Sequence, residues 1–384
     1  MNEQKFVLPS SKIAVVGVGG AGGNAVNRMV MDNFKGVDFI AVNTDLQDLN
    51  NKSKAPIRLQ IGEKLTQGLG AGANPEVGQR AAEESREIIK RCLQNANLVI
   101  ITAGMGKGTG TGASPVIASI AKELGKLVVA VVTKPFYFEG KHRIVNADIG
   151  IENLAKAVDS YIVVSNEMLI RMSGSASMAD AFAYADGVLR QCILGISDVI
   201  LNTQTMNIDF ADLCTVLRDK GRAYIGIGCG SGDNRVMTAI KEAVGITLQE
   251  TKISNATSVM LNVKAKHEVS AEEIDKAAVL VREVVHKDAN IVFGVDFRDD
   301  LPHDVEIMLI AAGLGGTPET AKPKTTSISD HANNYAGIIN SEPAPAKQPE
   351  PIKPKSGIPD SRVNFDDEDD DVPDWMKETR RGRL

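Results

Sequence analysis

Short apolar segments alternate with segments of helical periodicity from residue 12 onward. Five of the apolar segments are strand-length and rich in Val and Ile: KIAVVG, VDFIAV, LVIITA, KLVVAVV and YIVVS. Between them lie stretches such as PEVGQRAAEESREIIKRCL, whose apolar residues recur at the spacing of one helix face. Strands that are apolar throughout are typical of a parallel sheet that helices cover on both faces. The pattern therefore predicts a doubly wound α/β domain over residues 12–176.

A longer helical pattern follows, SMADAFAYADGVLRQCILGISDVILNT, and it predicts one central helix over residues 177–203. Beyond this helix, the helical stretches FADLCTVLRDKG and AEEIDKAAVLVREVV alternate with the strand-like AYIGIGC, SVMLNVKA, ANIVFGV and HDVEIMLIAAG. The alternation predicts a second, smaller α/β domain over residues 204–316.

The composition changes abruptly after Gly316. Nine of the fifteen prolines lie beyond it, among Lys, Ser, Thr and Ala with few large apolar residues. A segment that cannot bury apolar surface does not fold alone, so residues 317–364 are predicted to be a disordered linker.

The last segment, residues 365–384, reads FDDEDDD followed by VPDWMKETRRGRL, and it holds the only tryptophan of the chain. A large apolar side chain outside the folded part favours an anchor for a partner protein, although a lone aromatic in a tail can also have no role. The predicted partner-binding residues are Val372, Pro373, Trp375 and Met376.

Charge and composition exclude several classes of function. The net charge of -6 argues against nucleic acid as the main partner, because phosphate binding requires a basic face. No apolar run approaches the roughly 20 residues that cross a bilayer, and the start of the chain lacks the features of a signal peptide. The four cysteines form no CxxC pair, and the five histidines show no metal-ligand spacing. We therefore expect a cytoplasmic protein with no metal site of its own and no direct membrane insertion.

Glycine-rich loops carry the candidate chemistry. In GVGGAGGNAV, the residues Gly17, Gly19 and Gly22 satisfy GxGxxG between a strand and a helix, a context that holds phosphate. The motif alone fits a Rossmann dinucleotide site equally well, with Asp45 as the ribose-binding acid, and it also fits a purely structural turn.

Two further glycine-rich loops, GLGAGANP over 68–75 and GMGKGTGTG over 104–112, favour a phosphate site over a single-loop dinucleotide site or a structural turn. If each of the three loops follows a parallel strand, all of them meet at the sheet edge where ligands bind, and three loops suit a ligand with several phosphates. The last loop is not a Walker A motif, because Ile101 and Gly108 stand where GxxxxGK[ST] requires Gly and Ser or Thr.

GKGTGTG resembles the tubulin signature GGGTGTG with one change, at Lys107. In order and spacing, GVGGAGGNAV, AVNTD, GLGAGANPEVG, PFYFEGKHR and NIDFAD resemble the loops of the FtsZ family, the bacterial homologues of tubulin. The resemblance covers residues 12 to about 316, and the tail is similar to the family's linker and terminal peptide.

The resemblance implies the tubulin/FtsZ-like fold and a protein that binds GTP or GDP, with Mg²⁺ bound alongside the nucleotide. It implies GTP hydrolysis, head-to-tail assembly into protofilaments, and a place in the cytokinetic ring on the inner face of the membrane. The implied partners are further copies of this chain and, through the terminal peptide, membrane-tethering division proteins such as FtsA.

Site residues follow from the same resemblance, position by position. The phosphates would be held by Gly19, Gly20, Ala21, Gly22, Gly23, Asn24, Gly70, Ala71, Gly72, Ala73, Gly104, Gly106, Lys107, Gly108, Thr109, Gly110, Thr111 and Gly112. Other nucleotide contacts would come from Asn43, Asp45, Glu139, Arg143 and Asn166, with Glu139 at the ribose and Arg143 near the terminal phosphate.

Phe182 and Asp186 would bind guanine, by stacking on the base and by accepting from its N–H donors. Without the resemblance, Phe182 would be assigned to the core. Glu139 and Arg143 would be assigned to a surface ion pair of little energetic value.

Asp209 and Asp212 stand three residues apart at the start of a predicted helix. Their spacing alone favours ordinary helix capping. The resemblance implies instead that they act on the γ-phosphate of the GTP held by the next subunit, and orient the attacking water.

Lys107 has two possible roles. Its ammonium group could reach the β- or γ-phosphate, or it could face solvent or the subunit interface. If the backbone there has a positive φ, a side chain costs about 1–2 kcal/mol.

Two alternatives to the main interpretation remain. One is a paralogue that binds GTP and co-assembles but hydrolyses weakly. The other is an NAD-dependent oxidoreductase, which would use the first glycine loop alone and leave Asp209 and Asp212 without a role.

Overall fold

A computed structural model describes residues 12–315, apart from 33, 35, 168–177, 202–205, 207, 246–252 and 267–268. The predicted linker and the terminal segment that contains Trp375 lie outside the described residues.

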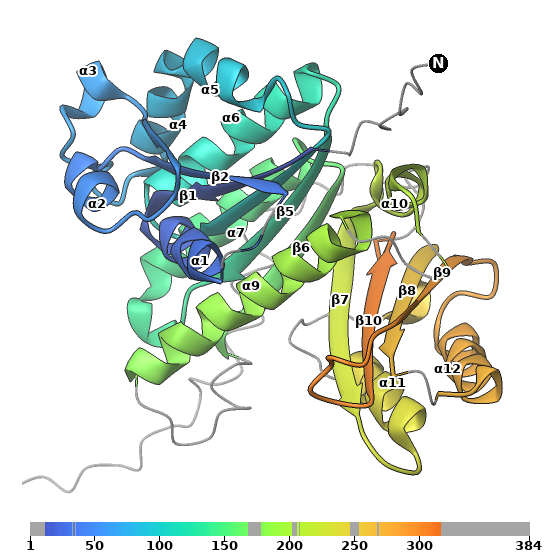
Figure 1. The fold of residues 1–384 in the computed structure, drawn as a ribbon. Coiled ribbons are helices and arrows are strands. Elements are labelled where there is room, and N and C mark those ends of the chain that lie inside the picture. Colours follow the sequence, from blue (N-terminus) through green and yellow to red (C-terminus); the bar gives the residue numbers. More distant parts are fainter. Residues whose placement is uncertain are drawn as a thin grey trace, which may run out of the picture. The chain divides into compact units, whose positions relative to one another are not determined.

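The strands form one sheet in the order β3-β2-β1-β4-β5-β6-β7-β10-β8-β9 (Figure 1). The first six strands pair in parallel throughout. They are β1 (Ile13–Val18), β2 (Val37–Asn43), β3 (Ile57–Gln60), β4 (Leu98–Gly104), β5 (Leu127–Lys134) and β6 (Ser160–Ser165). Because β1 and β4 are neighbours while β2 and β5 lie on their outer sides, the strand order reverses between β1 and β4.

Helices cover both faces of this parallel half, as the apolar strands predict. Alternate residues of β1 enter different cores: Ile13 and Val15 on one face, Ala14 and Val16 on the other. The first face carries α1 (Gly19–Met31) and α9 (Met178–Leu201), and the same core extends to α10 (Phe210–Leu217), which packs on the last three strands of the chain. The second face carries α4 (Pro75–Glu84), α5 (Arg86–Leu93), α6 (Thr109–Glu123) and α7 (Lys141–Ala155). The doubly wound architecture is therefore confirmed.

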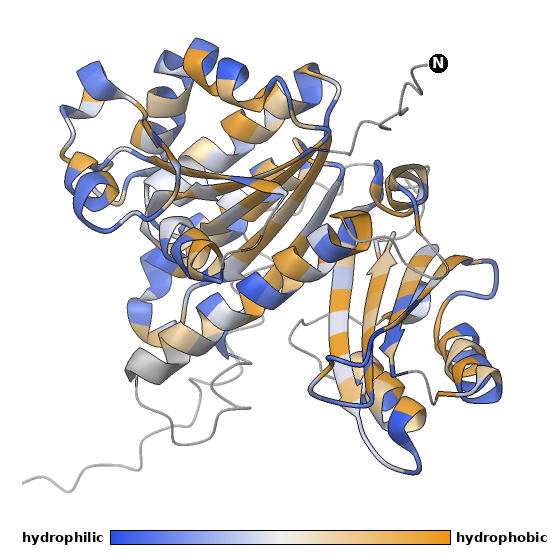
Figure 2. Ribbon diagram, viewed as in Figure 1, coloured by the Kyte–Doolittle hydropathy of each residue, from blue (hydrophilic) through white to orange (hydrophobic). Residues whose placement is uncertain are grey.

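The remaining strands of the sheet run in mixed directions. Strand β7 (Gly221–Gly230) is antiparallel to β10 (Val305–Ala312), which is antiparallel to β8 (Ser258–Ala265), and β8 is parallel to β9 (Asn290–Phe297). Helices α11 (Arg235–Gly245) and α12 (Ala271–Val284) cover one face of these strands and form a third core with them. Apolar colours run along the strands, and polar colours mark the outer faces of the helices (Figure 2).

One predicted helix is divided in two. PEVGQRAAEESREIIKRCL forms α4 and α5, which are separated at Ser85. The hydroxyl of Ser85 accepts a hydrogen bond from the backbone N–H of Gly62 at 3.0 Å. This bond connects the junction between the two helices to the residue before α3 (Glu63–Thr66). The short helices α2 (Leu46–Asn51) and α3 (Glu63–Thr66) were not expected from the pattern.

Helices α4 and α6 approach closely because Gly112 has no side chain. A Cβ atom added at Gly112 would lie 1.8 Å from the carbonyl oxygen of Pro75 and 2.6 Å from the backbone nitrogen of Gln79. Neither obstacle is a flexible side chain, so the helices themselves would have to move.

We predict that Gly112→Ala lowers the free energy of unfolding by about 1–3 kcal/mol, because an added methyl group overpacks this contact. Gly187→Ala is the matched control: Gly187 lies inside α9 with nothing within 4 Å of its added Cβ, so this change should stabilise the helix by about 0.5–1 kcal/mol. Thermal or denaturant unfolding measures both variants. Equal effects of the two substitutions would contradict the close approach.

Candidate functional site

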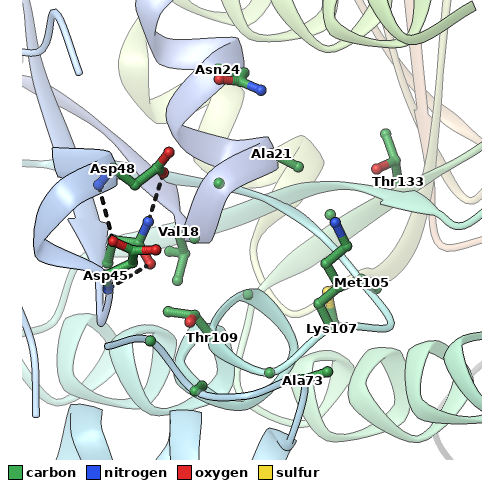
Figure 3. A pocket seen from close by; sticks show the side chains of 18 of the residues that line it. Val18, Ala21, Asn24, Asp45, Asp48, Ala73, Met105, Lys107, Thr109 and Thr133 are labelled. Carbon is green, nitrogen blue, oxygen red and sulfur yellow. Dashed lines mark hydrogen bonds between the residues drawn. The ribbon is translucent and has the colours of Figure 1, made fainter. Parts of the chain in front are cut away.

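A cavity of about 570 Å³ lies at the carboxyl ends of β1, β2, β4 and β5 (Figure 3). Most residues that the sequence assigns to a nucleotide line it. They are Gly19, Gly20, Ala21, Asn24, Asn43, Asp45, Gly70, Ala71, Gly72, Ala73, Gly104, Lys107, Gly108, Thr109, Gly110, Glu139, Asn166, Phe182 and Asp186. Segments far apart in the sequence thus meet around one space at the switch point of the sheet.

Two helices begin at this cavity without a side-chain cap. Helix α1 starts at Gly19 and α6 at Thr109, and neither has an acidic residue in its first turn. In contrast, Asp45 caps α2 and Asn74 caps α4 by accepting backbone N–H bonds. The N–H groups and the positive ends of the α1 and α6 dipoles are therefore available to an anionic ligand.

Several of the candidate residues shape the cavity without lining it: Gly22, Gly23, Gly106, Thr111, Gly112 and Arg143. A Cβ atom at Gly22 would lie 2.3 Å from the carbonyl oxygen of Thr102 in β4, so this glycine allows α1 to approach the sheet. Gly106 has a φ of 105°, and its N–H donates to the Thr111 hydroxyl at 2.8 Å, which fixes the turn before α6. The GLGAGANP loop was expected to follow a strand, but it follows α3. An isolated β-bridge between Asp45 and Leu69 joins this loop to the segment that follows β2.

Hydrogen bonds join the loops around the end of the cavity next to α2 and α6. The Thr44 and Thr109 hydroxyl groups lie 2.7 Å apart and link the end of β2 to the start of α6. Asn43 donates to the Asp48 carboxylate at 2.9 Å, and Lys52 pairs with the same carboxylate at 2.9 Å. The hydrogen bond to Asp48 and the charge of its carboxylate raise the pKa of Lys52 above its usual value.

Sequence reasoning missed Asp48 and Lys52, both of which line the cavity. The sequence did contain a signal for them. Asp48 and Lys52 are four residues apart, and Asp48 follows Asp45 by about one helical turn, so a helix there would place these side chains on one face.

The opposite end of the cavity is aromatic and acidic. Phe182 is 42% exposed and stands edge-on to Phe136, with ring centroids 5.1 Å apart, so the local assignment of Phe182 to the core is wrong. Asp186 pairs with Arg28 at 3.1 Å. Burial raises the pKa of Asp186, and the bond from Arg28 opposes that shift.

Three other polar side chains were assigned to the nucleotide: Glu139, Arg143 and Asn166. Glu139 lines the cavity and forms an ion pair with Arg143, which is the arrangement expected without the family resemblance. Asn166 is 6% exposed, and its side-chain oxygen has no hydrogen-bond partner in the described part of the chain. A buried polar atom without a partner that faces a cavity is available to a ligand.

Two family models match the chain. One is the Tubulin/FtsZ family GTPase domain, over residues 12–174, and the other is the FtsZ family C-terminal domain, over residues 221–315. This chain belongs to the FtsZ family. A solved FtsZ structure from M. jannaschii, described as an empty dimer, is 39% identical and superimposes with a TM-score of 0.75 over 79% of this chain and 89% of that one.

More distant structures share the fold. CetZ2 from Haloferax volcanii, solved as a GTPγS-bound protofilament, is 20% identical with a TM-score of 0.66, over 78% of this chain and 92% of that one. CetZ1 from the same organism, solved as a GDP-bound monomer, is 21% identical with a TM-score of 0.68, over 80% and 96% of the two chains.

FtsZ family membership makes this chain a GTP-binding cytoskeletal protein with a GTPase domain. It gives no support to an NAD-dependent oxidoreductase. Across the described residues, no helix is long and apolar enough to span a bilayer.

The two candidate catalytic acids of this FtsZ chain lie outside the cavity. Asp209 accepts from the N–H of Asp212 at 2.7 Å, and Asp212 accepts from the N–H of Asp209 at 3.2 Å. The pair forms a reciprocal capping box at the start of α10. Within one subunit, their visible role is therefore the local capping that their spacing favours.

Lys107 departs from the FtsZ signature without the expected strain. It is not among the residues with positive φ, a conformation that the preceding Gly106 adopts instead. Its side chain is exposed and extends from the loop toward the open middle of the cavity (Figure 3). No ion pair or hydrogen bond of its ammonium group is found among the described residues, whereas Lys52 is already paired with Asp48.

We predict that Lys107→Met weakens GTP binding by about tenfold and makes it less sensitive to salt, because one charge-assisted contact to phosphate is lost. Lys52→Met is the matched control, and its effect should be smaller because its ammonium group is held by a carboxylate. Nucleotide affinity at several salt concentrations measures both. Unchanged affinity in Lys107→Met with altered assembly would place this lysine at a subunit interface.

Proposed function

We propose that this chain is a GTP-hydrolysing FtsZ that assembles head to tail into protofilaments of the cytokinetic ring, on the inner face of the membrane. One observation carries the proposal: two uncapped helix starts, α1 and α6, meet a third glycine-rich loop around one cavity. Three sets of neutral N–H donors suit a ligand with several phosphates better than one with a single phosphate.

In this proposal, the nucleotide lies across the cavity with its phosphates against residues 19–24, 70–73 and 104–112. Glu139 contacts the ribose, and Arg143 acts near the terminal phosphate after leaving its ion pair with Glu139. Asn43, Asp45 and Asn166 complete the contacts, and the unpartnered oxygen of Asn166 supports its assignment.

The guanine base occupies the aromatic end. Phe182 presents an exposed ring face for stacking, and the Asp186 carboxylate accepts from the N–H donors that guanine has and adenine lacks. Arg28 holds this carboxylate in place from α1.

Mg²⁺ fits as an ion that arrives with the nucleotide. The described residues contain no cluster of three or more side chains that could hold a metal ion by themselves. Asp45 and Asp48 line the phosphate end, and Mg²⁺ commonly uses one or two carboxylates together with substrate phosphates. When bound, the ion would supply positive charge to the phosphates.

Hydrolysis requires a second subunit in this proposal. The cavity brings the phosphate cradle together, while Asp209 and Asp212 line no part of it. A head-to-tail contact would place these acids of one subunit over the γ-phosphate of the next, to orient the attacking water. Their capping bonds hold both carboxylates at the exposed start of α10.

The terminal segment with Val372, Pro373, Trp375 and Met376 is proposed to bind membrane-tethering division proteins such as FtsA. Its residues lie outside those that the structure describes, so the proposal rests on the sequence and the family.

A second candidate is a paralogue that binds GTP and co-assembles but hydrolyses weakly. Lys107 favours it, because a contact made equally in the ground state and the transition state tightens binding without speeding hydrolysis. Turnover per subunit at saturating GTP separates this candidate from a fully active FtsZ.

We predict that Asp186→Ala reduces the preference for GTP over inosine triphosphate, which lacks the exocyclic amino group of guanine. The parent protein should prefer GTP by about tenfold, and the variant should bind both nucleotides similarly, because a charge-assisted bond is lost. Asp32→Ala is the matched control, since Asp32 also pairs with an arginine between α1 and α9 but does not line the cavity. A preference that survives in Asp186→Ala would show that guanine is selected elsewhere.

We predict that Asp209→Ala or Asp212→Ala leaves GTP affinity near normal and abolishes turnover, since the acids serve the neighbouring site. Asp212→Ala should regain turnover when mixed with Gly108→Ala, whose added methyl group would lie 2.7 Å from the Ala71 Cβ atom and so disturb the phosphate loops. In an equal mixture, about a quarter of the head-to-tail interfaces combine an intact cradle with intact acids. Turnover that never exceeds the mean of the separate variants would refute the shared site.

A further inference from the structure

A half-buried ion pair, between a buried carboxylate and a partly exposed lysine, lies at the amino-terminal edge of the parallel sheet. Asp159, immediately before β6, is 2% exposed, and its carboxylate accepts from Lys122 Nζ at 2.7 Å and from the Val128 N–H at 2.8 Å. Lys122 belongs to the last turn of α6. A carboxylate this deeply buried remains charged only when it is paired and hydrogen-bonded, so Lys122 fixes its position.

Asp159 and its neighbour Ser160 in turn hold the end of α10. The Ser160 hydroxyl donates to the Leu217 carbonyl oxygen in the last turn of α10 at 2.6 Å. The Asp159 carboxylate accepts from the Asp219 N–H at 3.3 Å, and the Asp159 carbonyl oxygen accepts from the Gly221 N–H at 2.9 Å. We name Lys122, Asp159 and Ser160 the α10 clasp.

The α10 clasp lies at the junction between β6 and β7, two strands that are paired over a short length. Strands β6 and β7 pair through two residue pairs only, Ser160 with Gly221 and Tyr161 with Arg222. Asp219 has a φ of 54°, a conformation that residues other than glycine rarely adopt. Such a turn persists when its surroundings determine it, and the clasp supplies those contacts.

Helix α6 therefore connects the two ends of the proposed reaction. Thr109, at its start, lines the cavity, and Lys122, in its last turn, pairs with Asp159 and, at 2.9 Å, with Asp219, which follows the end of α10. Helix α10 spans only eight residues, or about 12 Å, from this contact to the acids at its start. Because so short a helix moves as one unit, a displacement of its last turn also displaces the acids at its start.

We propose that Lys122 is a positioning residue, which acts through its ion pairs with Asp159 and Asp219, next to the Ser160 bond, to set where α10 presents Asp209 and Asp212 to the next subunit. The inference rests on the proposed shared site. The competing explanation is that packing alone places α10, through the buried residues Leu213, Val216 and Leu217.

The test is turnover in mixtures of full-length variants. Lys122→Met should bind GTP within about twofold of the parent and lose between about tenfold and 100-fold in turnover, because a small displacement of catalytic groups is costly. Mixed with Gly108→Ala, whose acids are intact, it should regain turnover. Mixed with Asp212→Ala, it should stay at the mean of the two separate variants, since neither subunit supplies well-placed acids.

Lys126→Met is the matched control, because Lys126 follows the same helix but bonds to the Gln94 carbonyl oxygen, and its turnover should be unchanged. Lys122→Arg keeps the charge and should restore part of the activity. If Lys122→Met does not fold, Ser160→Ala decides the question, because it removes one bond to α10 and leaves the ion pair intact, and the same pattern in mixtures is expected.

Rescue of Asp212→Ala by Lys122→Met, or normal turnover in a folded Lys122→Met or Ser160→Ala, would overturn the positioning role. If Asp212→Ala and Gly108→Ala fail to rescue each other, the shared site itself is wrong, and that outcome is distinct from a failure of the clasp alone.

Discussion

The site depends on the backbone N–H groups at the starts of α1 and α6, which have no partners within their helices. A helix start leaves four N–H groups without partners in the helix, and no side chain caps either of these two helices. Because β1 and β4 are neighbours at the switch point of the sheet, the helices that follow them begin on the same edge. An anion with several oxygens satisfies both starts together, and the small residues of the loops leave space for it.

The two ends of the cavity differ in chemistry for a related reason. The end proposed to hold the phosphates offers neutral backbone N–H donors, with Asp45, Asp48 and the exposed Lys107 as charged side chains at its border. The base end consists of side chains from α9, where Phe182 and Asp186 lie one helical turn apart and face the cavity together. In the proposed binding mode a nucleotide spans both ends, so the placement of α9 against α1, with Asp186 bound to Arg28, would help to decide which base is accepted.

Much of this arrangement could be predicted from local patterns. The alternation of apolar strands and amphipathic helices is sufficient to predict the doubly wound sheet, and the glycine spacing predicts a phosphate site. Three features escaped. Two depend on contacts between distant residues: the junction at Ser85 is bonded to Gly62, and Asp48 and Lys52 join the cavity through the position of α2. The third is a local backbone conformation that residue types do not reveal: Gly106, not Lys107, takes the positive φ.

The sequence by itself determined most of the strands and helices, the glycine loops and the family, because periodicity and short motifs are properties of neighbouring residues. The spacing of Asp209 and Asp212 predicted a helix cap, but it gave no position for these acids relative to the cavity. Only the tertiary structure decided that they stand outside the cavity of their own subunit, and that Lys122, Asp159 and Ser160 bind the far end of α10. The reason is physical: the role of a buried carboxylate such as Asp159 depends on its hydrogen-bond partners, and only the fold brings those distant residues within hydrogen-bonding distance.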